Sequence, residues 1–317
     1  MRFFCLKLFL IFGLLSVFAT SSMADPAATE LLSLGRMNEA VSMLSSRADA
    51  ESLNQLSRAY FAMEQWDEAV KYGERAVSLD PDNATYHLWL GREYGRKAAD
   101  MNPLTAAGVA RKAKNEFERA VQLDPANLPA RLDLAQYYTE APAIMGGGLD
   151  KARDQAAQIQ KYDPAMSHLV LARVADREKQ YSEAEAQFRA AIKGAKNPAD
   201  MWLQLAAFYR QRARLDDMQS AVQSAMAEHG KPAESYFDAA RELYLGSRNL
   251  SAALQYLQSY LSSGKLVESA PAFRAHYLIG QLNEKMGNNR AAVTEYQASL
   301  ALASGFVPAR KALSRVQ

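Results

Sequence analysis

The chain has 317 residues, of which 49% are hydrophobic and 23% are charged, with only 11 prolines and 16 glycines. The abundant Ala, Leu, Gln, Glu, Arg and Lys residues lose little rotamer freedom in helices, so this composition predicts an all-α protein. The formal net charge of +2 excludes the strong overall basic field on which nucleic-acid binding relies, and we expect no nucleic-acid partner.

The first 24 residues follow a pattern of their own. Arg2 and Lys7 give a basic start, Leu8 to Ala19 is an apolar run, and small residues lead up to Ala24. This is the pattern of a secretory signal peptide, with cleavage expected near Ala24. The alternative is a permanent anchor, but the run is shorter than the roughly 20 residues that cross a bilayer. We therefore expect residues 1–24 to be a signal peptide and residues 25–317 to be periplasmic or otherwise exported.

Removal of this leader changes the chemistry that remains available. The only cysteine, Cys5, lies within it, so the mature chain has no thiol for a disulfide, a metal site or a nucleophile. Loss of Arg2 and Lys7 leaves 35 basic and 35 acidic side chains. No later segment is long and apolar enough to span a bilayer, so we expect no transmembrane segment in the mature chain.

Three similar tripeptides punctuate the first half of the mature chain: Leu79-Asp80-Pro81, Leu123-Asp124-Pro125 and Tyr162-Asp163-Pro164. Each of them follows an Ala-rich amphipathic stretch. Proline cannot continue a helix, because it lacks the backbone N–H and clashes with the preceding turn. The tripeptides therefore mark turns at which one helix ends and another begins.

Other residues recur at fixed distances from these prolines. Before Pro125, Ala120, Phe117 and Ala113 lie five, eight and twelve residues upstream. An earlier stretch holds a Leu-Gly pair and a tyrosine. Together the pattern consists of Leu90, Gly91, Tyr94, Ala113, Phe117, Ala120 and Pro125. It resembles the tetratricopeptide repeat, in which small residues let two helices approach closely and large ones fill the space between neighbouring pairs.

The same template recurs along nearly all of the mature chain. Met218 lies 34 residues after Ala184, and Ala252 lies 34 residues after Met218. We expect repeats at 50–83, 84–127, 128–166, 167–198, 199–232, 233–271 and 272–305, preceded by an incomplete unit and followed by a closing helix at 307–316. The alternative, a generic helical bundle, has no reason to repeat these positions at this period. The resemblance implies one domain, 25–317, a right-handed superhelical solenoid of about seven helix pairs plus the closing helix.

The resemblance also implies that the first helix of each pair lines the concave face. Four of the seven positions that follow the small residue of these helices are arginine, and further arginines lie about one turn later. The expected binding stripe is Arg58, Arg92, Arg96, Arg173, Arg177, Arg210 and Arg241. Guanidinium groups pair bidentately with carboxylates, so the stripe fits an acidic segment or a C-terminal carboxylate. The alternative is pairing with acids of adjacent repeats, such as Glu93, Asp133, Asp176 or Asp238.

Two insertions offer other contact surfaces, and little else in the sequence points to chemistry. Residues 98–109 lengthen the second repeat. Residues 139–149 contain three glycines whose amides could face an anion, but no phosphate-loop sequence follows them. The four histidines lie in different repeats without metal-ligand spacing, and three occupy a packing position of the template. We expect no catalytic residue, no metal and no cofactor.

These features predict a non-catalytic scaffold or adaptor of the bacterial cell envelope, which binds a protein or peptide in its concave groove. The alternatives are a carrier of a small ligand or metal on the same solenoid, or an enzyme without a recognisable motif. A solenoid of this kind does not by itself determine the function. The partner, the pathway and the oligomeric state do not follow from the sequence.

Overall fold

The computed structural model describes residues 25–317, which form seventeen α-helices and one short 3₁₀ helix. The first helices of successive pairs are α1 (Pro26–Leu34), α3 (Ala50–Ala62), α5 (Ala84–Asp100), α7 (Leu128–Glu140), α9 (Pro164–Arg177), α11 (Pro198–Gln211), α13 (Glu234–Gly246) and α15 (Ala272–Lys285). The second helices are α2 (Met37–Leu44), α4 (Trp66–Leu79), α6 (Pro103–Leu123), α8 (Leu149–Ile159), α10 (Tyr181–Gly194), α12 (Leu215–Ala227), α14 (Leu250–Ser262) and α16 (Asn289–Leu302). The chain continues into α17 (Val307–Val316), and the 3₁₀ helix η1 (Ala143–Met145) lies between α7 and α8.

The all-α solenoid of helix pairs is confirmed. The leader expected at residues 1–24 lies outside the described residues. Among residues 25–317, no helix has both the length and the hydropathy needed to cross a membrane.

Local sequence determines where these helices begin. The Asn83 side chain accepts hydrogen bonds from the first backbone N–H groups of α5, and Asn127 does the same for α7. Asp163 caps α9, and Pro164 occupies its first turn, where a backbone N–H would have no helical partner. The first two Asp-Pro tripeptides thus follow directly on the ends of α4 and α6, and the third caps the start of α9.

Within a pair, glycine permits the closest approach. A Cβ atom on Gly91 of α5 would lie 2.6 Å from the Phe117 ring on α6. The seventh pair repeats this contact, because a Cβ on Gly280 would lie 2.4 Å from the Tyr296 ring. Any side chain at either position would push the two helices apart.

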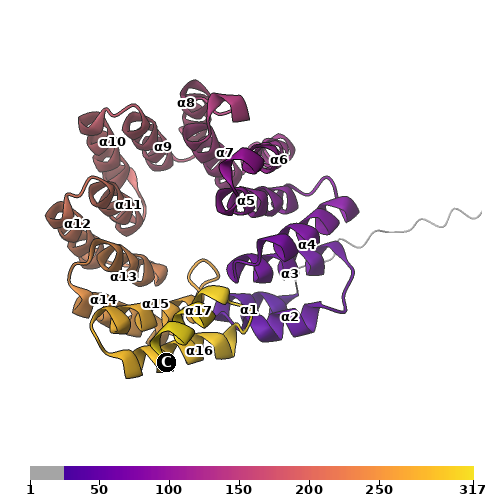
Figure 1. The fold of residues 1–317 in the computed structure, drawn as a ribbon. Coiled ribbons are helices and arrows are strands. Elements are labelled where there is room, and N and C mark those ends of the chain that lie inside the picture. The colour runs from indigo at the N-terminus through magenta and orange to yellow at the C-terminus, as the bar shows by residue number, and fades with distance from the viewer. Residues whose placement is uncertain (1–24) are drawn as a thin grey trace, which may run out of the picture.

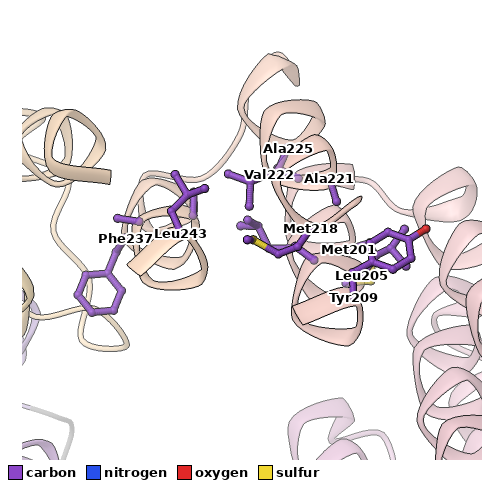
Figure 2. Close-up of a cluster of buried hydrophobic side chains, with 14 of the residues drawn as sticks. Met201, Leu205, Tyr209, Met218, Ala221, Val222, Ala225, Phe237 and Leu243 are labelled. Carbon is purple, nitrogen blue, oxygen red and sulfur yellow. The ribbon is translucent and has the colours of Figure 1, made fainter. Parts of the chain in front are cut away.

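Between pairs, the core is a series of interfaces. Figure 2 shows one of them, in which Met201, Leu205, Met218 and Val222 of α11 and α12 form a buried layer near Leu243 of α13. A polar contact also recurs: Tyr138 of α7 donates a hydrogen bond to Glu118 of α6 at 2.7 Å, and Tyr209 of α11 donates to Glu185 of α10 at 2.8 Å. Each unit is therefore held mainly by its neighbours, as expected for a repeat array.

The pairs follow one another around a ring (Figure 1). Helices α5, α7, α9, α11 and α13 lie on the inner side, and their partners α6, α8, α10, α12 and α14 lie on the outer side. The C-terminal helices α15–α17 return beside α1–α3. We call the contact between these two groups of helices, including the turn 303–306, the seam.

The seam has a buried apolar centre. Leu32, Met37 and Met63 from the N-terminal side pack with Phe273 and Phe306 from the C-terminal side, and none of these side chains is more than 3% exposed. The two phenylalanine rings meet edge to face, with centroids 5.1 Å apart. Such burial is typical of a core rather than of two solvated chain ends.

Hydrogen bonds surround this apolar centre. The Asn38 amide donates to Ala301 O at 2.9 Å, and its oxygen accepts from Ser304 N at 2.9 Å. Gln65 donates to Gly305 O at 2.8 Å, and Arg274 donates to Ala62 O at 2.8 Å. The first and last units therefore cap each other, so each covers the apolar face that the other would expose at an open end.

Candidate protein-binding site

The predicted arginine stripe lies on the first helices, and most of its members already have partners. Arg92 on α5 pairs with Asp133 on α7 at 2.6 Å, and Arg210 on α11 pairs with Glu242 on α13 at 2.6 Å. Each of these pairs joins one unit to the next. The alternative reading, in which the arginines bind acids of adjacent repeats, therefore describes the geometry of Arg92 and Arg210.

The other stripe residues differ from one another. Arg173 donates to Gln204 at 3.0 Å, and burial lowers its pKa. Arg241 is exposed and lies 3.7 Å from Asp238 of its own helix. Arg96 and Arg177 are exposed, and within the described part of the chain Arg177 has no hydrogen-bond or ion-pair partner. The structure thus leaves Arg96, Arg177 and Arg241 as the most available guanidinium groups.

Two of the acids that the sequence offered as partners of the stripe arginines, Asp176 and Glu93, do not pair with them. Asp176 pairs with Arg212, which is not in the stripe. Glu93 on α5 is fully buried with its carboxylate against Gly73 of α4, and neither carboxylate oxygen accepts a hydrogen bond within the geometric limits from residues 25–317. Burial raises the pKa of Glu93 to about 8. The nearby Ser57 hydroxyl acts against this shift, and the charge of Glu74 acts with it.

Arg58 has a different kind of partner from Arg92 and Arg210. Its Nε lies 2.9 Å from one oxygen of Glu268, and its Nη2 pairs with the other. Glu268 belongs to the loop between α14 and α15, so this bidentate pair crosses the seam. Both side chains are largely buried, which strengthens a charge-assisted contact relative to one at the open surface.

Sequence reasoning missed the aromatic residues that accompany these arginines. Phe61 meets Trp66 and Trp89 edge to face, at centroid distances of 5.5 and 5.8 Å. The guanidinium groups of Arg58 and Arg92 lie 4.9 and 4.8 Å from the Trp89 ring centroid. The signal in the sequence was the placement of two of the three tryptophans beside the first arginines of the stripe.

We call this surface the arginine–aromatic cluster; its members are Arg58, Phe61, Trp66, Trp89, Arg92 and Arg96. None of its three aromatic side chains is fully buried. Arg96 lies 5.4 Å from the Trp66 ring centroid. A cavity of about 540 Å³ adjoins these two residues and extends to Val307 and Lys311 of α17. Tryptophan and arginine in contact form the kind of surface that anchors protein partners.

Both predicted insertions are ordered elements. Residues 98–109 lengthen α5 to 17 residues and α6 to 21 residues. In the 139–149 segment, the N–H groups of Gly146, Gly147 and Gly148 donate to Ala143, Pro142 and Tyr138 at 2.8, 3.2 and 2.8 Å. These amides are used within the turn, so they are not free to bind an anion.

The three template histidines contact the second helix of their own pair. His87 Nδ1 lies 2.5 Å from Glu116, His168 Nδ1 lies 2.7 Å from Gln187, and His276 Nδ1 lies 2.7 Å from Glu295. Burial lowers the pKa of His87, but its hydrogen bonds to Glu116 and Pro81 O outweigh that effect and leave the pKa raised. Across residues 25–317, no three His, Cys, Asp or Glu side chains gather as metal ligands.

Comparisons with known proteins bear on the fold and on the type of repeat. Residues 50–83 and 273–305 match the tetratricopeptide repeat family. Tetratricopeptide repeat protein 37 of Xenopus laevis is 24% identical over 244 residues, and the match covers 75% of this chain but 14% of that protein. DnaJ homolog subfamily C member 7 of Mus musculus is 32% identical over 79 residues, which cover 25% of this chain and 14% of that protein.

The crystal structure of yeast Tom70 superposes with a TM-score of 0.53 at 16% identity, covering 94% of this chain and 66% of that one. At this identity the likeness shows the fold alone.

Proposed function

From the helix-pair solenoid and the tetratricopeptide repeat matches at residues 50–83 and 273–305, we propose that this chain is a non-catalytic scaffold that holds another protein on the inner face of its ring. The observation that carries the proposal is the arginine–aromatic cluster, where partly exposed Trp66 and Trp89 lie beside three guanidinium groups. Rigid aromatic and arginine side chains supply most of the binding energy at protein interfaces. An acidic protein segment is the partner that this chemistry fits best.

The experiment is affinity capture from an envelope extract with residues 25–317 as bait. Arg58→Gln, Arg92→Gln and Arg96→Gln together remove the three guanidinium groups of the arginine–aromatic cluster, and we call this protein the inner-face variant. Circular dichroism establishes that it is folded. A matched control removes three exposed arginines of second helices: Arg75→Gln, Arg111→Gln and Arg290→Gln. We expect a partner that the parent and the control retain and the inner-face variant loses. Equal retention by both variants would refute binding at the arginine–aromatic cluster.

We also propose that the protein works in the cell envelope of a bacterium. The support is the leader pattern, in which a basic start, a short apolar run and small residues before Asp25 favour export and cleavage. Cell fractionation followed by N-terminal sequencing tests this proposal. The expected product is periplasmic and begins at Asp25, whereas a cytoplasmic product that retains Arg2 and Lys7 would refute it.

A further inference from the structure

The loop between α14 and α15, residues 263–271, crosses the seam. The sequence spacing shows an excess here, since Ala252 and Ala292 are 40 residues apart instead of 34. In Figure 1 a loop between the orange α14 and the gold α15 extends toward the indigo α3. At its far end, Glu268 forms the bidentate pair with Arg58 of α3. The extra residues therefore carry a carboxylate onto the inner face of the first unit.

The loop is held in a defined shape. Tyr260, which is fully buried, donates a hydrogen bond to Ala270 O at 2.6 Å and accepts one from Val267 N at 3.0 Å. Leu266 and Val267 also pack against the buried core of the later repeats. These anchors lie on either side of Glu268. These anchors restrict the loop, so little conformational entropy is lost when the Glu268 carboxylate pairs with Arg58.

Glu268 differs from the acids that pair with the other inner-face arginines, because it reaches its arginine from a loop and not from the next helix. The acids that pair with Arg92 and Arg210 come from the next inner helix of the solenoid. The acid on Arg58 comes from a loop 210 residues away in sequence. Arg58 also lies over Trp89, which it shares with Arg92. A carboxylate that binds here contacts two nitrogens of the Arg58 guanidinium group, which itself lies on the Trp89 ring.

We propose that Glu268 is an internal occupant of an acid-binding site formed by Arg58, Trp89 and Arg92, and that an acidic segment of a partner binds by displacing it. The inference rests on the proposed function, since it names the chemistry of the partner and the contact that regulates its entry. The side chains of Arg58 and Glu268 are only 17% and 19% exposed. A partner carboxylate therefore gains the Arg58 site only after Glu268 has left.

Displacement of Glu268 removes one contact across the seam and leaves the others in place. Arg274 still pairs with Glu64 at 3.1 Å, and the apolar centre around Phe273 and Phe306 does not involve the loop. The site is thus regulated by competition within a closed ring. The apparent affinity of a competing segment is reduced in proportion to the fraction of molecules in which the site is free.

The direct test measures binding of a fluorescein-labelled hexaglutamate peptide to residues 25–317 by fluorescence anisotropy at low salt. Glu268→Gln keeps the shape of the side chain but removes its charge, and it is expected to bind the peptide about tenfold more tightly than the parent. Glu268→Ala, which removes the side chain beyond Cβ, is expected to do the same. Thermal unfolding followed by circular dichroism establishes that both variants are folded.

Two further variants separate this mechanism from a general loosening of the ring. Glu64→Gln breaks the other ion pair of the seam and leaves Arg58 occupied, so its peptide affinity is expected to match that of the parent. Arg58→Gln added to Glu268→Gln is expected to abolish the gain. Equal affinities of the parent and Glu268→Gln would overturn the inference, as would a gain in Glu64→Gln or one that survives Arg58→Gln.

These outcomes are independent of the capture experiment. If the inner-face variant still retains the partner, the proposed function fails whatever the peptide does. If the peptide affinities do not change but the inner-face variant loses the partner, only the role of Glu268 fails.

Discussion

Glu93 makes the stability of this protein depend on pH. Its side chain is fully buried, and burial raises its pKa from 4.5 to about 8. At neutral pH the folded protein therefore holds a protonated carboxyl group, whereas the unfolded chain releases that proton. Because the folded state has the higher pKa, the contribution to stability is complete below pH 4.5 and is lost as the pH rises to about 8.

The size of this effect follows from the two pKa values. One pKa unit corresponds to about 1.4 kcal/mol, so the free energy of unfolding falls by roughly 3 kcal/mol between acidic conditions and pH 7. Glu93→Gln has the same shape and does not titrate. We expect this variant to be more stable than the parent by roughly 3 kcal/mol at pH 7, and to match it near pH 4.

The assay is urea unfolding followed by circular dichroism at several pH values between 4 and 8. Glu30→Gln, at an exposed position on α1, removes a carboxylate without touching the buried site and serves as the control. The gap between Glu93→Gln and the parent should widen as the pH rises, while the gap for Glu30→Gln should not. A constant gap for Glu93→Gln would show that the buried carboxyl group does not titrate as argued.

Two further predictions concern packing. Gly91→Ala places a Cβ atom 2.6 Å from the Phe117 ring and should destabilise the protein by about 1 to 3 kcal/mol in thermal unfolding. Gly95→Ala, four residues along the same helix, places a Cβ atom with no other atom within 4 Å, so this variant should be neutral or stabilising. Phe306→Ala empties the centre of the seam and should cost about 3 to 5 kcal/mol in urea unfolding, while Val307→Ala at the neighbouring exposed position should cost far less. Equal costs within either pair would refute the packing described.

Much of the fold could be predicted because its determinants are local. The Asp-Pro tripeptides mark the turns between helices, and Asn83, Asn127 and Asp163 cap the helices that follow. The Gly91–Phe117 contact joins positions of one repeat. The ring closure could not be predicted in this way. It depends on small rotations summed over all the units, and no periodic residue encodes that sum.

The candidate site was predictable only in outline. The positions of the inner-face arginines follow from the repeat, but the Arg58–Glu268 pair joins residues 210 positions apart and depends on the closure. The sequence offered Glu93 as one of the acids of adjacent repeats that could pair with the arginines. It is buried because Gly73 stands where the second repeat has Phe117, and a Cβ at Gly73 would lie 2.1 Å from the Glu93 carboxylate. One missing side chain in a neighbouring helix thus decides where Glu93 lies.

The closed ring underlies both the inner-face site and the role of Glu268, and one crosslink tests it directly. Residues 25–317 contain no cysteine, so Asn38→Cys and Ser304→Cys introduce the only two thiols of that fragment. The Asn38 side-chain oxygen lies 2.8 Å from Ser304 Oγ across the seam. Oxidation in dilute solution should convert most of the protein into an internally crosslinked monomer with unchanged helical content, as seen by non-reducing electrophoresis and circular dichroism. Free thiols or crosslinked dimers in place of that monomer would contradict a closed ring.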